Sequence, residues 1–191
     1  MTAVGQGPAE WYEPFPAHKV IGNVYYVGSR DLATYLITTP EGHILINSGF
    51  DRTVPLIQKS VESLGFKMTD VKILLASHAH SDHVAGHARL QKLTGARVHV
   101  MRGDDQVIAS GGKGQYLYPT DRWDPCKVDR VLKDRDEVKL GGVTLVAPGA
   151  TVRWTSGTSS GEVRADAAGC ITIPRLKITA EPISLSIRKA K

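Results

Sequence analysis

The order of apolar and polar residues predicts strands followed by helices in the first third of the chain. Residues 20–50 are predicted to form short strands with a turn at Pro40-Glu41-Gly42, and the alternation of apolar and polar residues is clear over 34–38. Over residues 51–66 the apolar residues recur at intervals of three and four, which predicts a helix that Gly65 can end.

The middle of the chain repeats this order. The apolar run 71–76 predicts a buried strand, and the amphipathic segment 83–94 predicts a helix. The later predictions are a strand at 98–101, a helix at 104–110, a loop at 113–127 and two strands within 128–147. The three aromatic residues of that loop either border a pocket or form a small satellite core. Together these elements predict an α/β domain in which sheets pack between helices.

A histidine-rich loop, Ser77-His78-Ala79-His80-Ser81-Asp82-His83, joins the predicted buried strand to the next helix. Imidazole and carboxylate groups are zinc ligands, and α/β proteins bind ligands beyond the carboxyl ends of their strands. In an extended loop His78 and His80 point the same way, while Asp82 and His83 can turn toward a second, nearby point. The pattern predicts a metal site able to hold two ions with a hydroxide between them.

The spacing His78-x-His80-x-Asp82-His83 after a strand resembles the signature of the metallo-β-lactamase superfamily. The similarity extends over about residues 11–147 and is greatest to the third subclass of true β-lactamases, which has His at the last signature position. The other similar segments are 21–28 (opening strands), 35–49 (first hairpin and the turn beneath the metals), and 128–134 and 140–145 (later strands).

The resemblance implies the αββα sandwich of that family, an α/β fold, with the second half incomplete in this chain. It also implies two Zn²⁺ ions. His78 and His80 would hold the first, which polarises the lactam carbonyl, and Asp82 and His83 the second, which stabilises the departing nitrogen. A metal-bound hydroxide would attack, oriented by Asp82 as the catalytic residue. The implied function is a zinc-dependent hydrolase, a class B β-lactamase, with a small-molecule β-lactam as substrate.

Two alternatives stay open at this point. The same site on this fold also cleaves thioesters, so a hydroxyacylglutathione hydrolase type of enzyme is one of them. The other is a non-catalytic remnant or pseudo-enzyme. All seven histidines lie at or before His99, whereas the family has two more ligands downstream. Ala150 in Pro148-Gly149-Ala150-Thr151 stands where the family's turn has a His. We therefore expect one zinc ion, or weak binding.

The remaining polar candidates are predicted to be structural. His18, His43 and His99 are expected to be polar residues with satisfied hydrogen bonds. His87 is expected on the helix surface or at a pocket rim rather than as a spare ligand, although it lies four residues after His83. Asn47 occupies the position where the wider superfamily has an Asp that orients a metal ligand.

Composition and charge indicate how the chain divides into an arm, a domain and a tail. The 191 residues suffice for one domain, and 41% hydrophobic with 23% charged residues exclude a disordered or fibrous chain. A Pro-rich arm (1–19) precedes the domain (20–147), and an unmatched basic tail (148–191) is part of the same domain if it is ordered. Of the net charge of +5, most comes from this tail, which has seven Lys and Arg against three Asp and Glu. Because the tail lacks interleaved aromatic residues, a nucleic-acid partner is not expected.

The last expectations concern where the protein is located and whether it self-associates. No apolar run is long enough for a bilayer, so no membrane partner is expected. The resemblance implies a periplasmic or secreted protein, although Met1–Gly7 lacks the features of a signal peptide; otherwise the protein is cytoplasmic. An incomplete sandwich leaves apolar surface uncovered, so self-association is expected. Cys126 and Cys170 either pair or remain free.

Overall fold

The computed structural model describes residues 7–146, 151–156, 158–164 and 185–189. The chain divides into two units. The first comprises Met1–Leu132 with Leu140–Val143, and the second comprises Lys133–Lys139 with Thr144–Lys191. The Ala150 turn and Cys170 lie outside the described residues. Cys126 is a buried free thiol, and burial raises its pKa to about 11.

The first unit is built on a seven-stranded sheet in which the strands follow their order in the sequence. The first four strands pair antiparallel, and β4 to β7 pair parallel. The strands are β1 (His18–Ile21), β2 (Val24–Tyr26), β3 (Tyr35–Thr39), β4 (Gly42–Ile46), β5 (Val71–Leu75), β6 (Arg97–Met101) and β7 (Arg130–Leu132). The parallel half brings the carboxyl ends of β4, β5 and β6 to one edge of the sheet.

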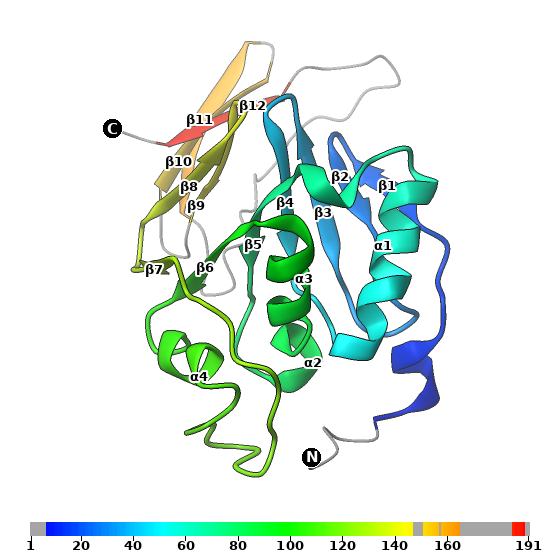
Figure 1. The fold of residues 1–191 in the computed structure, drawn as a ribbon. Coiled ribbons are helices and arrows are strands. Elements are labelled where there is room, and N and C mark those ends of the chain that lie inside the picture. The colour runs from blue at the N-terminus through cyan, green and yellow to red at the C-terminus, as the bar shows by residue number, and fades with distance from the viewer. Residues whose placement is uncertain (1–6, 147–150, 157, 165–184, 190–191) are drawn as a thin grey trace. The chain divides into compact units, whose positions relative to one another are not determined.

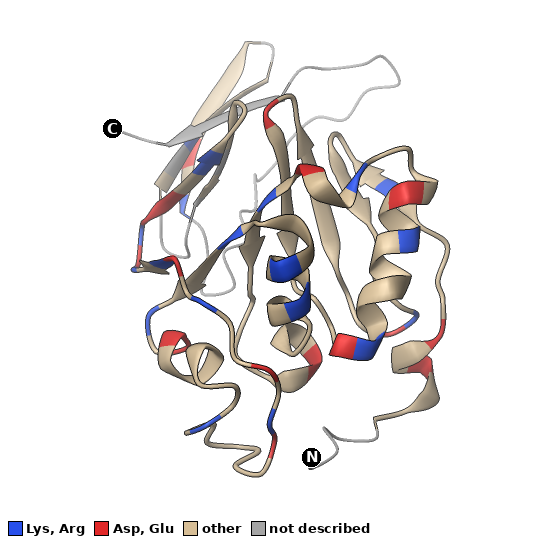
Figure 2. Cartoon of the chain, in the orientation of Figure 1, with Lys and Arg blue, Asp and Glu red and all other residues tan. Residues whose placement is uncertain are grey.

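Helices α1 (Val54–Ser63) and α3 (His87–Thr94) lie over one face of this sheet (Figure 1). The other helices of the first unit are η1 (Ala9–Tyr12), η2 (Asp51–Thr53), η3 (Met68–Asp70), α2 (Ser81–Val84) and α4 (Asp105–Ala109). None of the helices in the described residues is long and apolar enough to cross a membrane. Lys and Arg are interspersed with Asp and Glu along the helices and loops (Figure 2).

Both faces of the sheet carry buried apolar side chains. Leu45 and Leu74 join the cluster that includes Val61 of α1 and Leu90 of α3. Their strand neighbours Ile44 and Ile73 are at most 1% exposed, and they point to the opposite face because side chains alternate along a strand. A sheet that is apolar on both faces belongs in a layered α/β fold. The α/β prediction is confirmed, as a partial sandwich with one main sheet.

The predicted helix 83–94 is two helices, α2 and α3. The backbone N–H of Gly86 donates to the Gly49 carbonyl at 3.0 Å instead of continuing the helical ladder. A Cβ at Gly86 would lie 2.8 Å from the Ser48 carbonyl oxygen and 2.8 Å from Val54 Cγ2. Only glycine allows this close approach, and the approach turns the chain at that point.

Two further predictions need correction. Segment 128–147 contains three strands, because a turn at 133–136 separates β7 from β8 (Glu137–Leu140), which pairs with β9 (Val143–Val146) in a separate sheet. Two hydrogen bonds join the ends of this turn. The Lys133 backbone N–H donates to the Asp136 carboxylate at 3.0 Å, and the Asp136 backbone N–H donates to the Lys133 carbonyl at 3.0 Å. The arm is not extended throughout, since η1 lies within it and packs Trp11 against Phe50.

The second unit contains an antiparallel three-stranded sheet in the order β11-β10-β12. Its strands are β10 (Thr151–Ser156), β11 (Ser159–Arg164) and β12 (Leu185–Lys189). Trp154 is 9% exposed and lies over Gly161, where a Cβ would be 2.9 Å from the indole nitrogen.

Strand β1 is the surface where we expect self-association to occur. This strand lies at one end of the sheet, all four of its residues are exposed, and Val20 and Ile21 are 50% and 72% exposed. An exposed apolar edge strand is a template for pairing with another chain. We expect dimers in sedimentation velocity at high protein concentration, and fewer dimers after Ile21→Lys. Leu93→Lys on α3 is the matched control, and an equal effect of both variants would contradict an interface at β1.

Candidate metal centre

The histidine loop begins where β5 ends, and the end of β4 holds it in place. Asn47 donates its backbone N–H to the Leu75 carbonyl at 2.8 Å. Its φ of 65° lies in the left-handed region, which Asn tolerates better than most residues. Asn47 Oδ1 accepts hydrogen bonds from the backbone N–H of Ser77 at 2.9 Å and from Ser77 Oγ at 3.1 Å, and Nδ2 donates to the Ala33 carbonyl at 3.4 Å. Thus Asn47 fixes the first residue of the loop.

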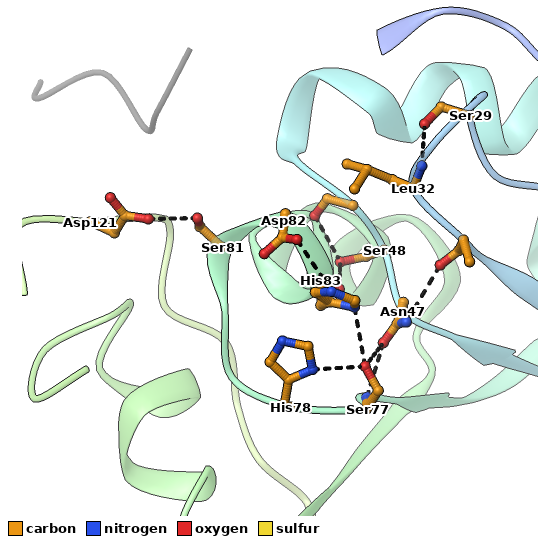
Figure 3. Close-up of polar contacts among 12 residues, drawn as sticks. Ser29, Leu32, Asn47, Ser48, Ser77, His78, Ser81, Asp82, His83 and Asp121 are labelled. Atoms are coloured by element: carbon orange, nitrogen blue, oxygen red, sulfur yellow. Dashed lines mark hydrogen bonds and ion pairs between the residues drawn. The ribbon is translucent and has the colours of Figure 1, made fainter. Parts of the chain in front are cut away.

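Ser77 connects Asn47 to two histidines (Figure 3). Ser77 Oγ lies 3.2 Å from His78 Nδ1 and 3.1 Å from His83 Nδ1. A hydroxyl has one proton, and the carbonyl-type oxygen of Asn47 can only accept it. Both histidines can therefore donate an Nδ1–H to Ser77. This leaves Nε2 of His78 available for a ligand, while Nε2 of His83 faces the Asp82 carboxylate at 3.2 Å.

Three of the four predicted ligands converge. One ligand atom from each of His78, Asp82 and His83 lies within 4.8 Å of the others. His83 Nε2 is 3.2 Å from Asp82 Oδ2, and both side chains are 23% exposed. The helix α2 that carries Asp82 and His83 begins directly after His80, whose carbonyl accepts the His83 N–H at 3.0 Å. Two nitrogens and a carboxylate oxygen are a donor set suited to zinc.

The fourth predicted ligand, His80, lies outside this group. Its ring centroid is 4.3 Å from that of His78 and 5.3 Å from that of Tyr118. Both histidines line a cavity of about 360 Å³ whose wall includes Asp104, Gln115 and Tyr116. The donors therefore fit one ion with three protein ligands, and among the described residues they do not complete two ions.

The charges of the site suit metal binding at neutral pH. Partial burial opposes ionisation of Asp82, but the hydrogen bond and charge of His83 outweigh it, so the pKa of Asp82 lies below its usual value. Burial, followed by the charges of His83 and His80, lowers the pKa of His78. An ionised Asp82 and a neutral His78 are the forms that bind metal.

The cavity wall includes a residue that sequence reasoning missed. Asp104 is near the start of α4, and burial raises its pKa, although a hydrogen bond from the Ala79 backbone and the charge of His80 oppose this. No spacing in the sequence links Asp104 to the histidine loop. Of the loop aromatics, Tyr116 is 91% exposed and lines the cavity, whereas Trp123 packs against the helix-side core. Both interpretations of the aromatic loop thus hold, for different residues.

The prediction for His87 is wrong. It is 1% exposed, and its Nδ1 lies 2.7 Å from Ser48 Oγ. A continuous helix would place His87 beside His83, but the chain turn at Gly86 directs it into the interior. Burial lowers its pKa to about 4, partly offset by the Leu75 carbonyl. His87 is also outside the group of converging ligands.

The other three histidines differ in how well their ring nitrogens are satisfied. His18 is as predicted, with Nδ1 2.8 Å from the Pro16 carbonyl oxygen. His43 and His99 are buried, and Nδ1 of each has no hydrogen-bond partner among the residues that the structure describes. The prediction was therefore wrong for that nitrogen in each.

Comparison with known proteins agrees with this fold. The family profile of the metallo-beta-lactamase superfamily matches residues 30–168, so the chain belongs to this superfamily. Its fold is similar to that of the native FEZ-1 metallo-β-lactamase from Legionella gormanii, with 40% identity, a TM-score of 0.70, and coverage of 88% of this chain and 69% of that chain. The class B3 di-zinc metallo-β-lactamase LRA-12 from an Alaskan soil metagenome is also 40% identical, with a TM-score of 0.72 and coverage of 74% and 55%.

A curated relative belongs to a different enzyme class. The hydroxyacylglutathione hydrolase of Pseudomonas putida is 40% identical over 82 residues, which are 41% of this chain and 24% of that protein. The chain spans about a third or less of the curated relatives it matches, and about half of several solved structures. The chain therefore shares the family and fold of these proteins but covers only part of their length. Their activities are not assigned to it by this similarity alone.

Proposed function

We propose that this protein is a zinc-dependent hydrolase that opens the ring of β-lactams. The observation that carries this proposal is the convergence of His78, Asp82 and His83 beside an open cavity. The likeness to class B3 metallo-β-lactamases, at 40% identity over most of the chain, favours β-lactams among the substrates of this fold. A cavity of about 360 Å³ suits a small-molecule substrate.

The roles of the residues follow from their contacts. His78, Asp82 and His83 would hold the zinc ion, which supplies a Lewis acid and lowers the pKa of a coordinated water. The ionised Asp82 carboxylate would accept a hydrogen bond from the attacking water and orient it. The exposed ring of Tyr116 and the side chain of Gln115 line the cavity, where they can contact the substrate beyond the reacting amide.

Turnover of a chromogenic cephalosporin with added zinc tests this proposal. We expect hydrolysis that a chelator abolishes and zinc restores, and a fall of about a hundredfold in Asp82→Asn, because the neutral amide is a weaker zinc ligand and a weaker acceptor for the water than the carboxylate. A Glu41→Gln variant, changed in the exposed turn between β3 and β4, is the matched control and should match the parent. Absence of turnover in a folded, zinc-loaded protein would contradict the proposal and favour the non-catalytic alternative.

A thioesterase is the second candidate, because of the similarity to hydroxyacylglutathione hydrolase. The same assay series distinguishes the two when a hydroxyacyl-glutathione thioester is offered in place of the cephalosporin. The value of kcat/KM for each substrate decides between them, and a larger value for the thioester would replace the β-lactam assignment.

A further inference from the structure

We propose that Ser81 and Asp121 are positioning residues, whose mutual hydrogen bond holds the loop 112–122 against helix α2 as one wall of the cavity. This hydrogen bond is called the latch below. Its effect on catalysis rests on the function proposed above, whereas the latch itself does not depend on any substrate.

The loop 112–122 is closed at its base and braced from inside. The Trp123 backbone N–H donates to the Gly111 carbonyl at 3.1 Å, which joins the two ends of the loop. Within the loop, Arg122 Nη1 donates to the Pro119 carbonyl at 2.9 Å. A compact surface loop with adjoining ends and internal contacts of its own is an Ω-loop. Such a loop keeps its own shape, so its position over the cavity depends on its contacts with the rest of the protein.

The outer part of the loop is not held in place by burial. Tyr116, Leu117 and Tyr118 are 91%, 61% and 52% exposed. Gln115, Tyr116 and Leu117 nevertheless line the cavity that His78 and His80 also line. A rotation of the loop about its base would therefore change the width of the cavity.

The latch is a short hydrogen bond to a carboxylate (Figure 3). Ser81 Oγ donates to Asp121 Oδ2 at 2.6 Å. Hydrogen bonds to an ionised acceptor are among the stronger ones in proteins, and Ser81 is only 8% exposed, so water competes little for it.

A second contact joins the same two segments. The ring of Tyr118 meets the ring of His80 edge-on, with 5.3 Å between the centroids. Ser81 is the first residue of α2 and directly precedes Asp82. The latch therefore sets the distance between the cavity wall and the helix that carries the candidate metal ligands.

Steady-state kinetics on the chromogenic cephalosporin, with zinc-loaded protein, test the effect on the site. Ser81→Ala and Asp121→Ala should each raise KM by about three- to tenfold, the usual range for the loss of one hydrogen bond. Values of kcat and zinc affinity should stay within about twofold of the parent, because the wall loosens while the metal ligands stay in place. Asp121→Asn retains an acceptor oxygen for Ser81 and should restore most of the parent's KM. Asp124→Ala, at an exposed acid of the same segment, is the matched control.

The double variant Ser81→Ala/Asp121→Ala tests whether the two residues act through one contact. Its KM should be no higher than that of the single variants, because either substitution already removes the latch. Additive effects would overturn the proposal, and so would a parallel loss of kcat and zinc affinity, which would locate the effect at the metal ligands instead.

NMR relaxation measures the latch without a substrate. Backbone order parameters across residues 114–120 should be about 0.85 in the parent and fall to about 0.6 in Ser81→Ala and in Asp121→Ala. The cross-relaxation between the rings of His80 and Tyr118 should disappear in both variants. Order parameters or a KM equal to the parent's in these two variants would overturn the proposal. Absence of turnover with both the cephalosporin and the thioester would contradict the proposed function, while the order parameters would still decide whether the latch exists.

Discussion

Lowering the pH from 7 to 4.5 is expected to reduce the free energy of unfolding by about 2.5 kcal/mol through His87 alone. The ring is 1% exposed, and burial lowers its pKa from 6.5 to about 4. This gap corresponds to about 3 kcal/mol, of which most falls between these two pH values. Because His87 lies in the interior beneath the metal loop, the loss affects the whole first unit rather than its surface.

The sign follows from which state takes up the proton. Above pH 6.5 His87 is neutral in both states and costs nothing. Between pH 6.5 and about 4 the unfolded chain binds a proton that the folded chain does not, so the unfolded state gains stability. The stability associated with a neutral His87 is therefore complete above pH 6.5, and it is lost as the pH falls toward 4.

Urea unfolding of His87→Gln at both pH values isolates this effect. Glutamine retains a polar group for Ser48, 2.7 Å from the original Nδ1, but does not titrate. The other histidines contribute equally to parent and variant, so the difference in pH dependence belongs to His87. His18→Gln, at an exposed histidine, is the control and should retain the parent's pH dependence. If His87→Gln loses as much stability on acidification as the parent does, the ring is not buried in solution as described.

The part of the site that the sequence could predict is the part set by neighbours in the chain. An apolar run, a short polar loop and an amphipathic helix place His78, Asp82 and His83 beyond the end of β5, because strand and helix periodicities are local properties. The same reasoning predicts the α/β order of elements. The apolar run 71–76 likewise predicts a buried strand, and Val71, Ile73 and Leu74 of β5 are buried.

What the sequence could not predict depends on contacts between distant residues. His87 turns inward because Gly86 approaches the backbone of Ser48, and no periodicity reveals that contact. Ser77 orients two histidines because Asn47, 30 residues earlier, accepts its proton. Asp104 reaches the cavity because β6 lies beside β5 in the sheet. Each of these placements needs the tertiary fold.

Replacing Ser77 with alanine is expected to weaken zinc binding by about 10–100-fold, the usual cost of losing a residue that orients metal ligands. This corresponds to about 1.4–2.7 kcal/mol. The backbone hydrogen bond from Ser77 to Asn47 remains in Ser77→Ala, so the loop keeps its anchor at 2.9 Å. What disappears is the shared acceptor for the Nδ1–H groups of His78 and His83. Their rings are then free to rotate and to move the proton to Nε2, the atom needed for the metal.

The imidazole tautomers report this loss directly. Nitrogen NMR of the zinc-free protein, at a pH where His78 is neutral, should show Nδ1–H for His78 in the parent and a mixture with Nε2–H in Ser77→Ala. Ser77→Thr keeps a hydroxyl and should restore both the tautomer and most of the affinity, which a purely structural role of Ser77 would not require. Ser81→Ala is the matched control, because its hydroxyl donates to Asp121 at 2.6 Å and contacts no histidine in the described part of the chain. Parent-like zinc affinity and unchanged tautomers in Ser77→Ala would show that the two rings hold their orientation without this hydroxyl.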